Sequence, residues 1–415
     1  MLDGLPALWW NIFPSLLPED EVRQLHCKLS HVSKSLYDIS KIIKLHKKCS
    51  FFRNIYIPKS IPFNIIQSTM LYFAKQYNSS QKWLVYIQCD TREYEISKMI
   101  IETSHIFNIA LCSNGKLIEN IEQLVRILSM APERISSLDL HYAQLLNSHI
   151  SILTPYLANL QQLTTINLEN NNFSFTGALL LPQFLSKMPQ LTSLNLASNS
   201  LDSTVLESCL RNLTQLQLLN LRNNNIRTSG MELLVPMIAK LPLLETLNIG
   251  SNSILTDGVR LLASIKLPKL KTLSLANNYL ENSEEQLSIY LDMIPQIISL
   301  NLSCNYITDF SKINPCLEKM CCLQSLNLSY NRIYTSVAIS IIETIVKLLH
   351  IKEVNLSSNF IGNDGAITII SYLRMMPQLE LLDLKDNPLI YKYTIKELKQ
   401  TIETLGYNTT VYLEN

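Results

Sequence analysis

One pattern of apolar residues and asparagine returns along most of the chain and constrains its fold more than any other feature. The pattern reads Leu-x-x-Leu-x-Leu-x-x-Asn-x-Leu, and residues 191–201 match it at every defined position. Two fainter copies, around Ile55 and Val85, precede the clear ones. Repetition at this period predicts a solenoid in which neighbouring units share one continuous core. Eleven clear copies, at intervals of 25 to 29 residues, begin at positions 106, 135, 163, 191, 216, 244, 270, 297, 323, 351 and 379.

Each copy predicts a strand followed by a helix. In the Leu-x-Leu part both leucines point into the core, and the residue between them points outward. The asparagine follows where the chain leaves the strand, although Ala143 replaces it in one copy. Its amide is expected to bond backbone groups that the turn leaves unpaired, and stacking extends these bonds into a ladder. Helical spacing follows, as in residues 228–242, and we expect Thr256 and Asn363 to cap the helices of their repeats.

The strand-plus-helix unit resembles the ribonuclease-inhibitor class of leucine-rich repeats over residues 106–389. Strands pack roughly 4.8 Å apart and helices about 8–10 Å apart, so a stack of such units must curve. We therefore predict an α/β leucine-rich-repeat solenoid (horseshoe), with a parallel β-sheet on the concave face and helices on the convex face. Residues 46–105 are expected to form degenerate first repeats. Residues 390–415 are expected to form a C-terminal cap, with an amphipathic helix from Tyr393 to Leu405 and a short strand from Val411 to Leu413.

The resemblance implies that a partner protein binds the concave face. The residue between the paired leucines is polar in nearly every copy: Ala110, Asp139, Asn167, Asn195, Asn220, Asn248, Ser274, Asn301, Asn327, Asn355 and Asp383. This row either recognises a partner or reflects the frequency of Leu-Asn-Leu in such repeats. Interface hot spots are more often large side chains, and these are sparse on the predicted face. The residues predicted to bind the partner are His141, Tyr142, Glu169, Arg222 and Tyr330.

The repeat does not account for residues 1–45, which we predict to be a short all-α segment. Leu-Pro, Ile-Phe, Leu-Pro-Glu-Asp and Val-Ser-Lys-Ser-Leu-Tyr follow one another there, in an order that resembles an F-box. That three-helix motif binds the adaptor subunit of a cullin–RING ubiquitin ligase. Leu8 stands where the motif has a glutamate, and the stretch leading to Val32 is about a turn longer than usual. The alternative is a helical cap over the first repeat. The F-box resemblance implies adaptor contacts at Leu5, Pro6, Trp9, Ile12, Phe13 and Leu16.

Charge and composition exclude several classes of partner. The 35 basic and 34 acidic residues leave a net charge of +1, which disfavours nucleic acid. No stretch of about 18 residues is apolar and uncharged, so no membrane span is expected. Asp3 lies where a signal peptide needs positive charge, and the nine cysteines have no regular spacing. We therefore expect an intracellular, cytosolic protein with reduced thiols.

Motifs for catalysis or cofactor binding are not found in the sequence. Gly115-Lys116 lacks the flanking residues of a phosphate-binding loop. His26, Cys27, His31, His46 and Cys49 fit no standard zinc-finger spacing, so neither a metal nor a cofactor is predicted.

We expect a non-catalytic protein-binding module, either an F-box-type substrate receptor of a ubiquitin ligase or a scaffold or occluding inhibitor. Its composition and architecture also resemble leucine-rich-repeat effectors that intracellular bacteria inject into host cells. This resemblance implies that the protein is located in the cytosol of a host cell.

Overall fold

The computed structural model describes residues 53–56, 83–88, 107–112, 121–130, 132–171, 173–405 and 409–413. The segment predicted to be helical, residues 1–45, lies outside this part of the chain. The chain divides into two units between Ile166 and Asn167. Strand β5 (Thr165–Asn167) lies across the division.

The described strands of the first unit pair in parallel and in chain order. β1 places Ile55 opposite Val85 of β2, and β2 in turn places Val85 opposite Ile109 of β3. This register aligns the two faint copies of the pattern with the first clear copy. The described elements are β1 (Arg53–Tyr56), β2 (Trp83–Gln88), β3 (Phe107–Cys112), α6 (Ile121–Met130), the 3-10 helix η1 (Pro132–Arg134), β4 (Ile135–Asp139) and α7 (Asn147–Leu157).

The second unit alternates strands and helices, and its strands β6 to β14 also pair in parallel and in chain order. The strands are β6 (Ser193–Asn195), β7 (Leu218–Asn220), β8 (Thr246–Asn248), β9 (Thr272–Ser274), β10 (Ser299–Asn301), β11 (Ser325–Asn327), β12 (Glu353–Asn355), β13 (Leu381–Asp383) and β14 (Thr410–Tyr412). The helices are α8 (Phe175–Ala178), α9 (Leu181–Leu185), α10 (Ser203–Leu210), α11 (Arg227–Ile238), α12 (Leu255–Leu262), α13 (Glu284–Asp292), α14 (Asn314–Lys319), α15 (Thr335–Ile345), α16 (Asn363–Ser371), the 3-10 helix η2 (Tyr372–Met375) and α17 (Lys392–Leu405).

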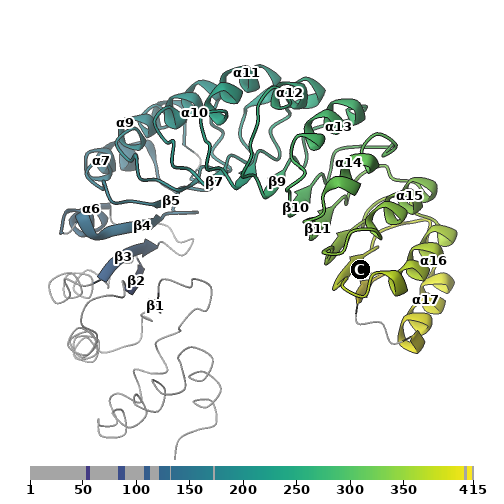
Figure 1. Ribbon diagram of the computed structural model, residues 1–415. Helices are drawn as coiled ribbons and strands as arrows, with labels where there is room; N and C mark the ends of the chain where they lie inside the picture. Colours follow the sequence, from purple (N-terminus) through teal and green to yellow (C-terminus); the bar gives the residue numbers. More distant parts are fainter. Residues whose placement is uncertain are drawn as a thin grey trace, which may run out of the picture. The chain divides into compact units, whose positions relative to one another are not determined.

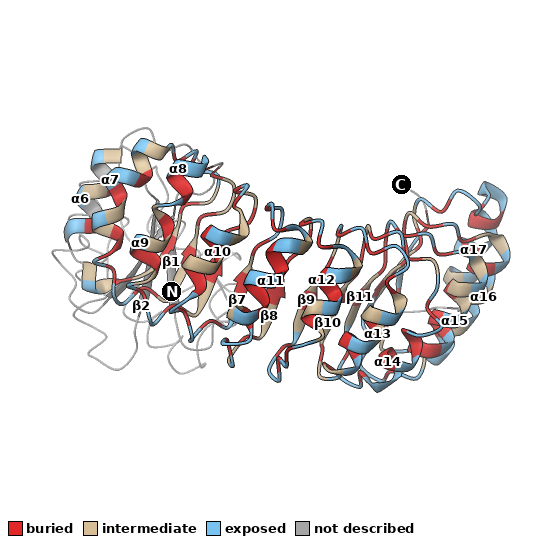
Figure 2. Ribbon diagram, turned by 90° about the horizontal axis from the view of Figure 1, so that it is seen from above, coloured by how far each residue is buried: buried red, intermediate tan, exposed pale blue. Residues whose placement is uncertain are grey.

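The second unit curves, with its strands along the inner side of an arc and its helices along the outer side (Figure 1). The core lies between these layers, and each helix of the second unit contains buried residues (Figure 2). Leu219 and Leu221 are fully buried, whereas Asn220 between them is only half-buried. The alternation is that predicted from the Leu-x-Leu pair, and the curvature is that predicted from the different packing distances of strands and helices. The predicted α/β solenoid is therefore confirmed.

A buried asparagine follows each strand from β6 to β13 and hydrogen-bonds the backbone of two repeats. The Oδ1 atom of Asn305 accepts from the backbone N–H of Asn278 at 2.7 Å. Its Nδ2 atom donates to the backbone oxygens of Leu275 and Leu302 at 2.9 and 3.0 Å. The predicted asparagine ladder is therefore confirmed. The same three bonds recur at Asn199, Asn224, Asn252, Asn278, Asn331 and Asn359.

The predicted helix caps at Thr256 and Asn363 are wrong. Both residues lie inside the first turn of their helices, after Ile254 and Gly362, and neither helix has a side-chain cap. The Thr256 hydroxyl lies 2.7 Å from the hydroxyl of Ser283 in the next repeat. The side-chain oxygen of Asn363 accepts from the backbone of Tyr391, also in the next repeat. These polar groups join neighbouring repeats, which local sequence cannot reveal.

Replacing a ladder asparagine is expected to destabilise the solenoid strongly. Asn305→Ala would leave the buried N–H of Asn278 and two buried carbonyl groups without the partners described above. We expect a loss of about 3 kcal/mol in the free energy of unfolding, measured by urea denaturation followed by circular dichroism. The matched control is Asn225→Ala, because Asn225 is exposed, and its expected change is within about 0.5 kcal/mol. Equal losses in the two variants would contradict a structural role for the ladder.

Candidate functional site

The side chains between the paired leucines form a half-buried polar row on the open face of the sheet. The side-chain oxygen of Asn220 accepts from the backbone N–H of Arg222 at 3.1 Å, and this bond holds the chain as it leaves the strand. The same bond is made by Asn195, Asn248, Asn301, Asn327, Asn355 and Asp383.

At three neighbouring members of the row, Asn301, Asn327 and Asn355, only the side-chain oxygen is used in this way. Strand pairing aligns Asn301, Asn327 and Asn355 in register. Within the described part of the chain, their Nδ2 groups make no bond to a protein acceptor. The row therefore has two roles: its oxygens stabilise the turns, and its amide N–H groups are hydrogen-bond donors on the open face.

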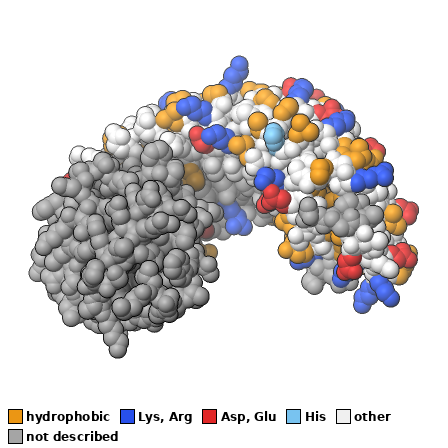
Figure 3. Space-filling model, turned by 60° about the horizontal axis from the view of Figure 1, so that its bottom comes forward, with side chains coloured by type: hydrophobic (Ala, Val, Ile, Leu, Met, Phe, Trp, Pro, Cys, Tyr) orange, Lys and Arg blue, Asp and Glu red, His pale blue; other side chains and the backbone are white. Residues whose placement is uncertain are grey.

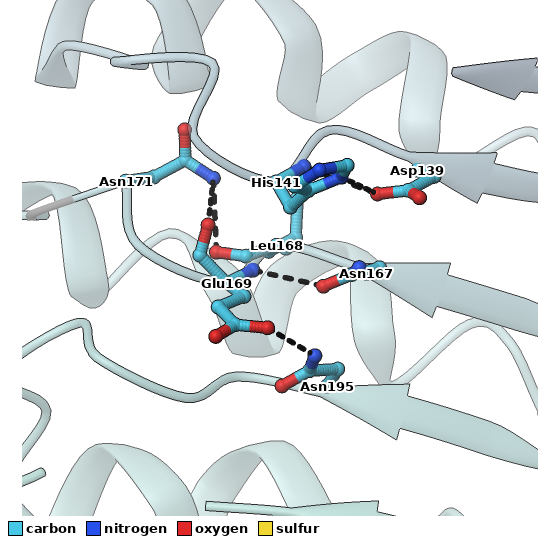
Figure 4. A network of polar contacts seen from close by, with 7 residues as sticks. All are labelled: Asp139, His141, Asn167, Leu168, Glu169, Asn171 and Asn195. Atoms are coloured by element: carbon cyan, nitrogen blue, oxygen red, sulfur yellow. Dashed lines mark hydrogen bonds and ion pairs between the residues drawn. The ribbon is translucent and has the colours of Figure 1, made fainter. Parts of the chain in front are cut away.

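The first unit holds two of the predicted binding residues side by side. The Nδ1 atom of His141 lies 2.6 Å from Oδ1 of Asp139, which also accepts from the backbone N–H of His141 (Figure 4). The ring of Tyr142 meets the imidazole edge to face, with 5.8 Å between centroids, and Tyr142 is 48% exposed. Asp139 thus orients the histidine, and Tyr142 presents its ring to solvent.

Glu169, near the start of the second unit, is fixed by hydrogen bonds to two members of the polar row. Its carboxylate accepts from Nδ2 of Asn195 at 2.9 Å, and its backbone N–H donates to Asn167 at 3.1 Å (Figure 4). The amide donor of Asn195 is therefore occupied by Glu169, whereas those of Asn301, Asn327 and Asn355 are not bonded within the described part of the chain. The carboxylate also places a negative charge beside β6.

Arg222 is an exposed cation just after strand β7, and its charge influences the pKa of the Cys304 thiol. Burial raises the pKa of the Cys304 thiol, while a hydrogen bond with Ser303 and the charge of Arg222 lower it. Two strands, β8 and β9, separate these residues. Gly250 and Ala276 occupy the position equivalent to Arg222, two residues after the ends of those strands, and neither side chain is larger than a methyl group. The guanidinium can therefore extend along the sheet face.

The residue before each ladder asparagine has a left-handed backbone. In the second unit its φ lies between 52° and 59°, at Asn170, Ser198, Asn223, Ser251, Asn277, Cys304, Tyr330, Ser358 and Asp386. Tyr330, one of the predicted binding residues, is at this position and is 59% exposed. Three strands separate β7 from β11, so the backbones of Arg222 and Tyr330 lie about 19 Å apart. The structure does not bring these two residues into one contact site.

Sequence reasoning missed a set of exposed aromatic side chains beside the strand face. They lie in the loops that follow the strands. Two of them come immediately after a ladder asparagine: Tyr279 after Asn278, and Tyr306 after Asn305. The recurrence of an aromatic residue at this position in adjacent repeats was the available signal.

The described residues contain no group of three or more side chains suited to hold a metal ion. The histidines and cysteines between His26 and Cys49, and the proposed adaptor contacts from Leu5 to Leu16, lie outside the described residues. No helix in the described ranges is long and apolar enough to cross a membrane. On the face drawn in Figure 3, charges of both signs alternate with hydrophobic side chains over the described surface.

The repeat geometry agrees with a known sequence family. A family model described as "Leucine Rich repeat" matches residues 212–235, 319–334 and 347–369. The fold is a leucine-rich-repeat solenoid. No curated protein matches the sequence.

Two solved structures are similar to this leucine-rich-repeat chain. One is an internalin from Listeria monocytogenes, with 17% identity and a TM-score of 0.45 over 99% of this chain and 98% of that chain. The other is from the Rad7 and Elc1 complex in yeast, with 13% identity and a TM-score of 0.48 over 86% of this chain and 79% of that chain. Likenesses of this degree carry no argument about function.

Removal of the Arg222 charge is expected to slow alkylation of Cys304. The positive charge stabilises the thiolate, so Arg222→Ala raises the thiol pKa and leaves less thiolate at pH 8. Across a solvated distance of several ångströms the expected effect on the rate is about twofold. Iodoacetamide labelling followed by peptide mass spectrometry measures the rate at Cys304. Arg211→Ala is the control, since that exposed arginine pairs with Glu207 on α10. An equal slowing in this variant would contradict a specific effect of the Arg222 charge on Cys304.

Proposed function

We propose that this leucine-rich-repeat protein is a non-catalytic module that binds a partner protein on the open strand face. The observation that carries the proposal is the row of amide donors whose oxygens are already fixed by the backbone. Preorganised donors lose little conformational entropy on binding, and they require acceptors on the partner. The proposed partner contacts are His141 and Tyr142 in the first unit, and Glu169, Arg222 and Tyr330 in the second.

We further propose that the protein is an F-box-type substrate receptor of a cullin–RING ubiquitin ligase. The support is the order of motifs in residues 1–45, upstream of a solenoid of the kind that holds substrates in such receptors. In this proposal Leu5, Pro6, Trp9, Ile12, Phe13 and Leu16 contact the adaptor subunit. The resemblance to effectors of intracellular bacteria extends the proposal to a ligase receptor acting in the cytosol of a host cell.

The second candidate is a scaffold or occluding inhibitor that works through the strand face alone. The observation that favours it is Leu8, which stands in place of the glutamate of the F-box motif. In this case residues 1–45 only cover the first repeat, because a solenoid end exposes core side chains unless a cap covers it.

Calorimetry of the full chain against the F-box adaptor subunit separates the two candidates. A ligase receptor is expected to bind with a dissociation constant of about 1 μM or lower. Trp9→Ala combined with Phe13→Ala is expected to weaken binding at least about tenfold, because aromatic anchors carry much of an interface. Phe175→Ala, which removes a 65% exposed aromatic side chain on α8, is the control and should bind unchanged. No binding by the intact chain would reject the F-box function and leave the strand face as the working surface.

A further inference from the structure

One hydrogen bond in the second unit joins a carboxylate to the polar row of the strand face. Oε2 of Glu169 accepts from Nδ2 of Asn195 at 2.9 Å (Figure 4). Glu169 lies two residues after Asn167, the row member of β5, and Asn195 is the row member of β6. The side-chain oxygen of Asn195 also accepts from the backbone N–H of Ala197 at 3.1 Å. A row asparagine can therefore stabilise its turn and donate to a carboxylate at the same time.

The row members of the next two strands, Asn220 and Asn248, make the same turn bond but have no carboxylate. Their oxygens accept from the backbone N–H groups of Arg222 and Gly250, both at 3.1 Å. Parallel pairing places Asn220 opposite Asn248, about 4.8 Å apart. Their Nδ2 groups bond no acceptor in the part of the chain that the structure describes. These two neighbouring amide groups can therefore donate to an acceptor from another molecule.

The residue at the repeat position of Glu169 explains why these donors are not bonded. Two residues after the row member, the chain has Ala197 after β6, Arg222 after β7 and Gly250 after β8. Alanine and glycine have no acceptor in the side chain, and a guanidinium is only a donor. The position that supplies an anion after β5 therefore supplies a cation after β7.

Arg222 carries a positive charge that no described side chain neutralises. Its guanidinium forms no ion pair and no hydrogen bond with the described residues. The outward positions of β6 to β11 are the first and third residues of each strand and the residue two further on, and Arg222 is the only charged residue among them. A Cβ atom at Gly250 would lie 3.2 Å from Oδ1 of Asn248, so glycine leaves this side of Asn248 open. The face beside Arg222 and Asn248 is therefore positive and uncrowded.

A guanidinium next to two amide donors is a set of groups that binds an anion. Its planar fork matches the two oxygens of a carboxylate, and such charge-assisted hydrogen bonds are about twice as strong as neutral ones. One guanidinium balances the single charge of a carboxylate, whereas a phosphate monoester carries about −1.5 to −2. The acceptor that Asn195 already binds, Glu169, is also a carboxylate. The charge balance and this contact both favour a carboxylate ligand.

We propose that Asn220, Arg222 and Asn248 form a carboxylate site, which binds an aspartate or glutamate side chain of the partner protein. This inference rests on the proposed function, because it assigns a chemical class to the segment bound on the open strand face. Arg222 supplies the charge, and the Nδ2 groups of Asn220 and Asn248 donate to the carboxylate oxygens. An acidic segment of the partner is thereby anchored at β7 and β8.

Fluorescence anisotropy of a labelled hexaglutamate peptide, titrated with the full chain at about 100 mM salt, tests the site. We expect a dissociation constant of about 200 μM, and at least about tenfold weaker binding of hexaglutamine. Arg222→Ala is expected to weaken hexaglutamate binding at least about tenfold. Asn248→Asp is expected to weaken it as much, because it replaces a donor with a negative charge. This variant keeps its turn, since the carboxylate of Asp383 makes the turn bond of the row at 3.0 Å.

The matched control is Asn355→Asp, which makes the same chemical change on β12. Four strand spacings separate β12 from β8, or about 19 Å. At this salt concentration charges are screened beyond about 10 Å, so the affinity for hexaglutamate should stay within about twofold. Circular dichroism of each variant establishes that it is folded.

Glu169→Ala is expected to tighten hexaglutamate binding about threefold in the same titration. The change releases the Nδ2 group of Asn195, which lies opposite Asn220 in the strand register, and removes a negative charge beside β6. A loss of folded protein cannot produce tighter binding, so this gain is specific to the site. Weaker binding in this variant would contradict the proposal.

Four further outcomes would overturn the proposal. They are no change in anisotropy up to about 0.5 mM protein, equal affinity for hexaglutamine, unchanged affinity in both Arg222→Ala and Asn248→Asp, or equal weakening by Asn355→Asp. The titration needs no natural partner, so its failure rejects only the carboxylate site. The wider proposal fails separately, if a protein that binds this chain keeps its affinity when Tyr142 and Tyr330 are replaced by alanine.

Discussion

The side-chain amide of the ladder asparagine is the interaction on which the second unit depends. The chain turns sharply after three strand residues, and the backbone groups at that turn are buried away from water. An unpaired buried peptide group is costly, so every repeat needs an internal partner there. Asparagine supplies a donor and an acceptor on one short side chain. The bonds of Asn305 to Asn278 and Leu275 join it to the preceding repeat, and so the turn of one repeat is completed by the next.

This dependence gives the array a direction. Each ladder residue serves its own turn and the turn of the repeat before it, as Asn224 does for Leu196 and Asn199. The position of each repeat is therefore fixed by its neighbour on the C-terminal side as well as by shared core packing. The same geometry holds the strand face open, because the leucines turn inward and the row from Asn195 to Asn355 stays at the surface.

The fold followed from the sequence because its physical signal is repeated. Residues equivalent to Leu219, Leu221 and the buried Asn224 recur at the same positions of successive repeats. A chance match in one repeat therefore does not affect the prediction of the fold. The helix caps did not follow, because Thr256 and Asn363 interact with the next repeat and local pattern contains no information on that contact. The exposed aromatic side chains were missed for a related reason: Tyr334 and Phe360 meet only after neighbouring loops have been stacked. The predicted strand-face residues remain a hypothesis, and Arg222 and Tyr330 lie on strands too far apart to touch one ligand group.

The left-handed residue that precedes each ladder asparagine limits how the loops of this protein can diversify. Branching at Cβ makes that backbone region unfavourable for valine, isoleucine and threonine. None of the three occurs at the position in the second unit, where asparagine, serine, aspartate, cysteine and tyrosine are found instead. In this chain the position is therefore held by small residues and by one aromatic residue, Tyr330. The turn that makes the solenoid possible therefore also limits which side chains the chain can present where it leaves each strand.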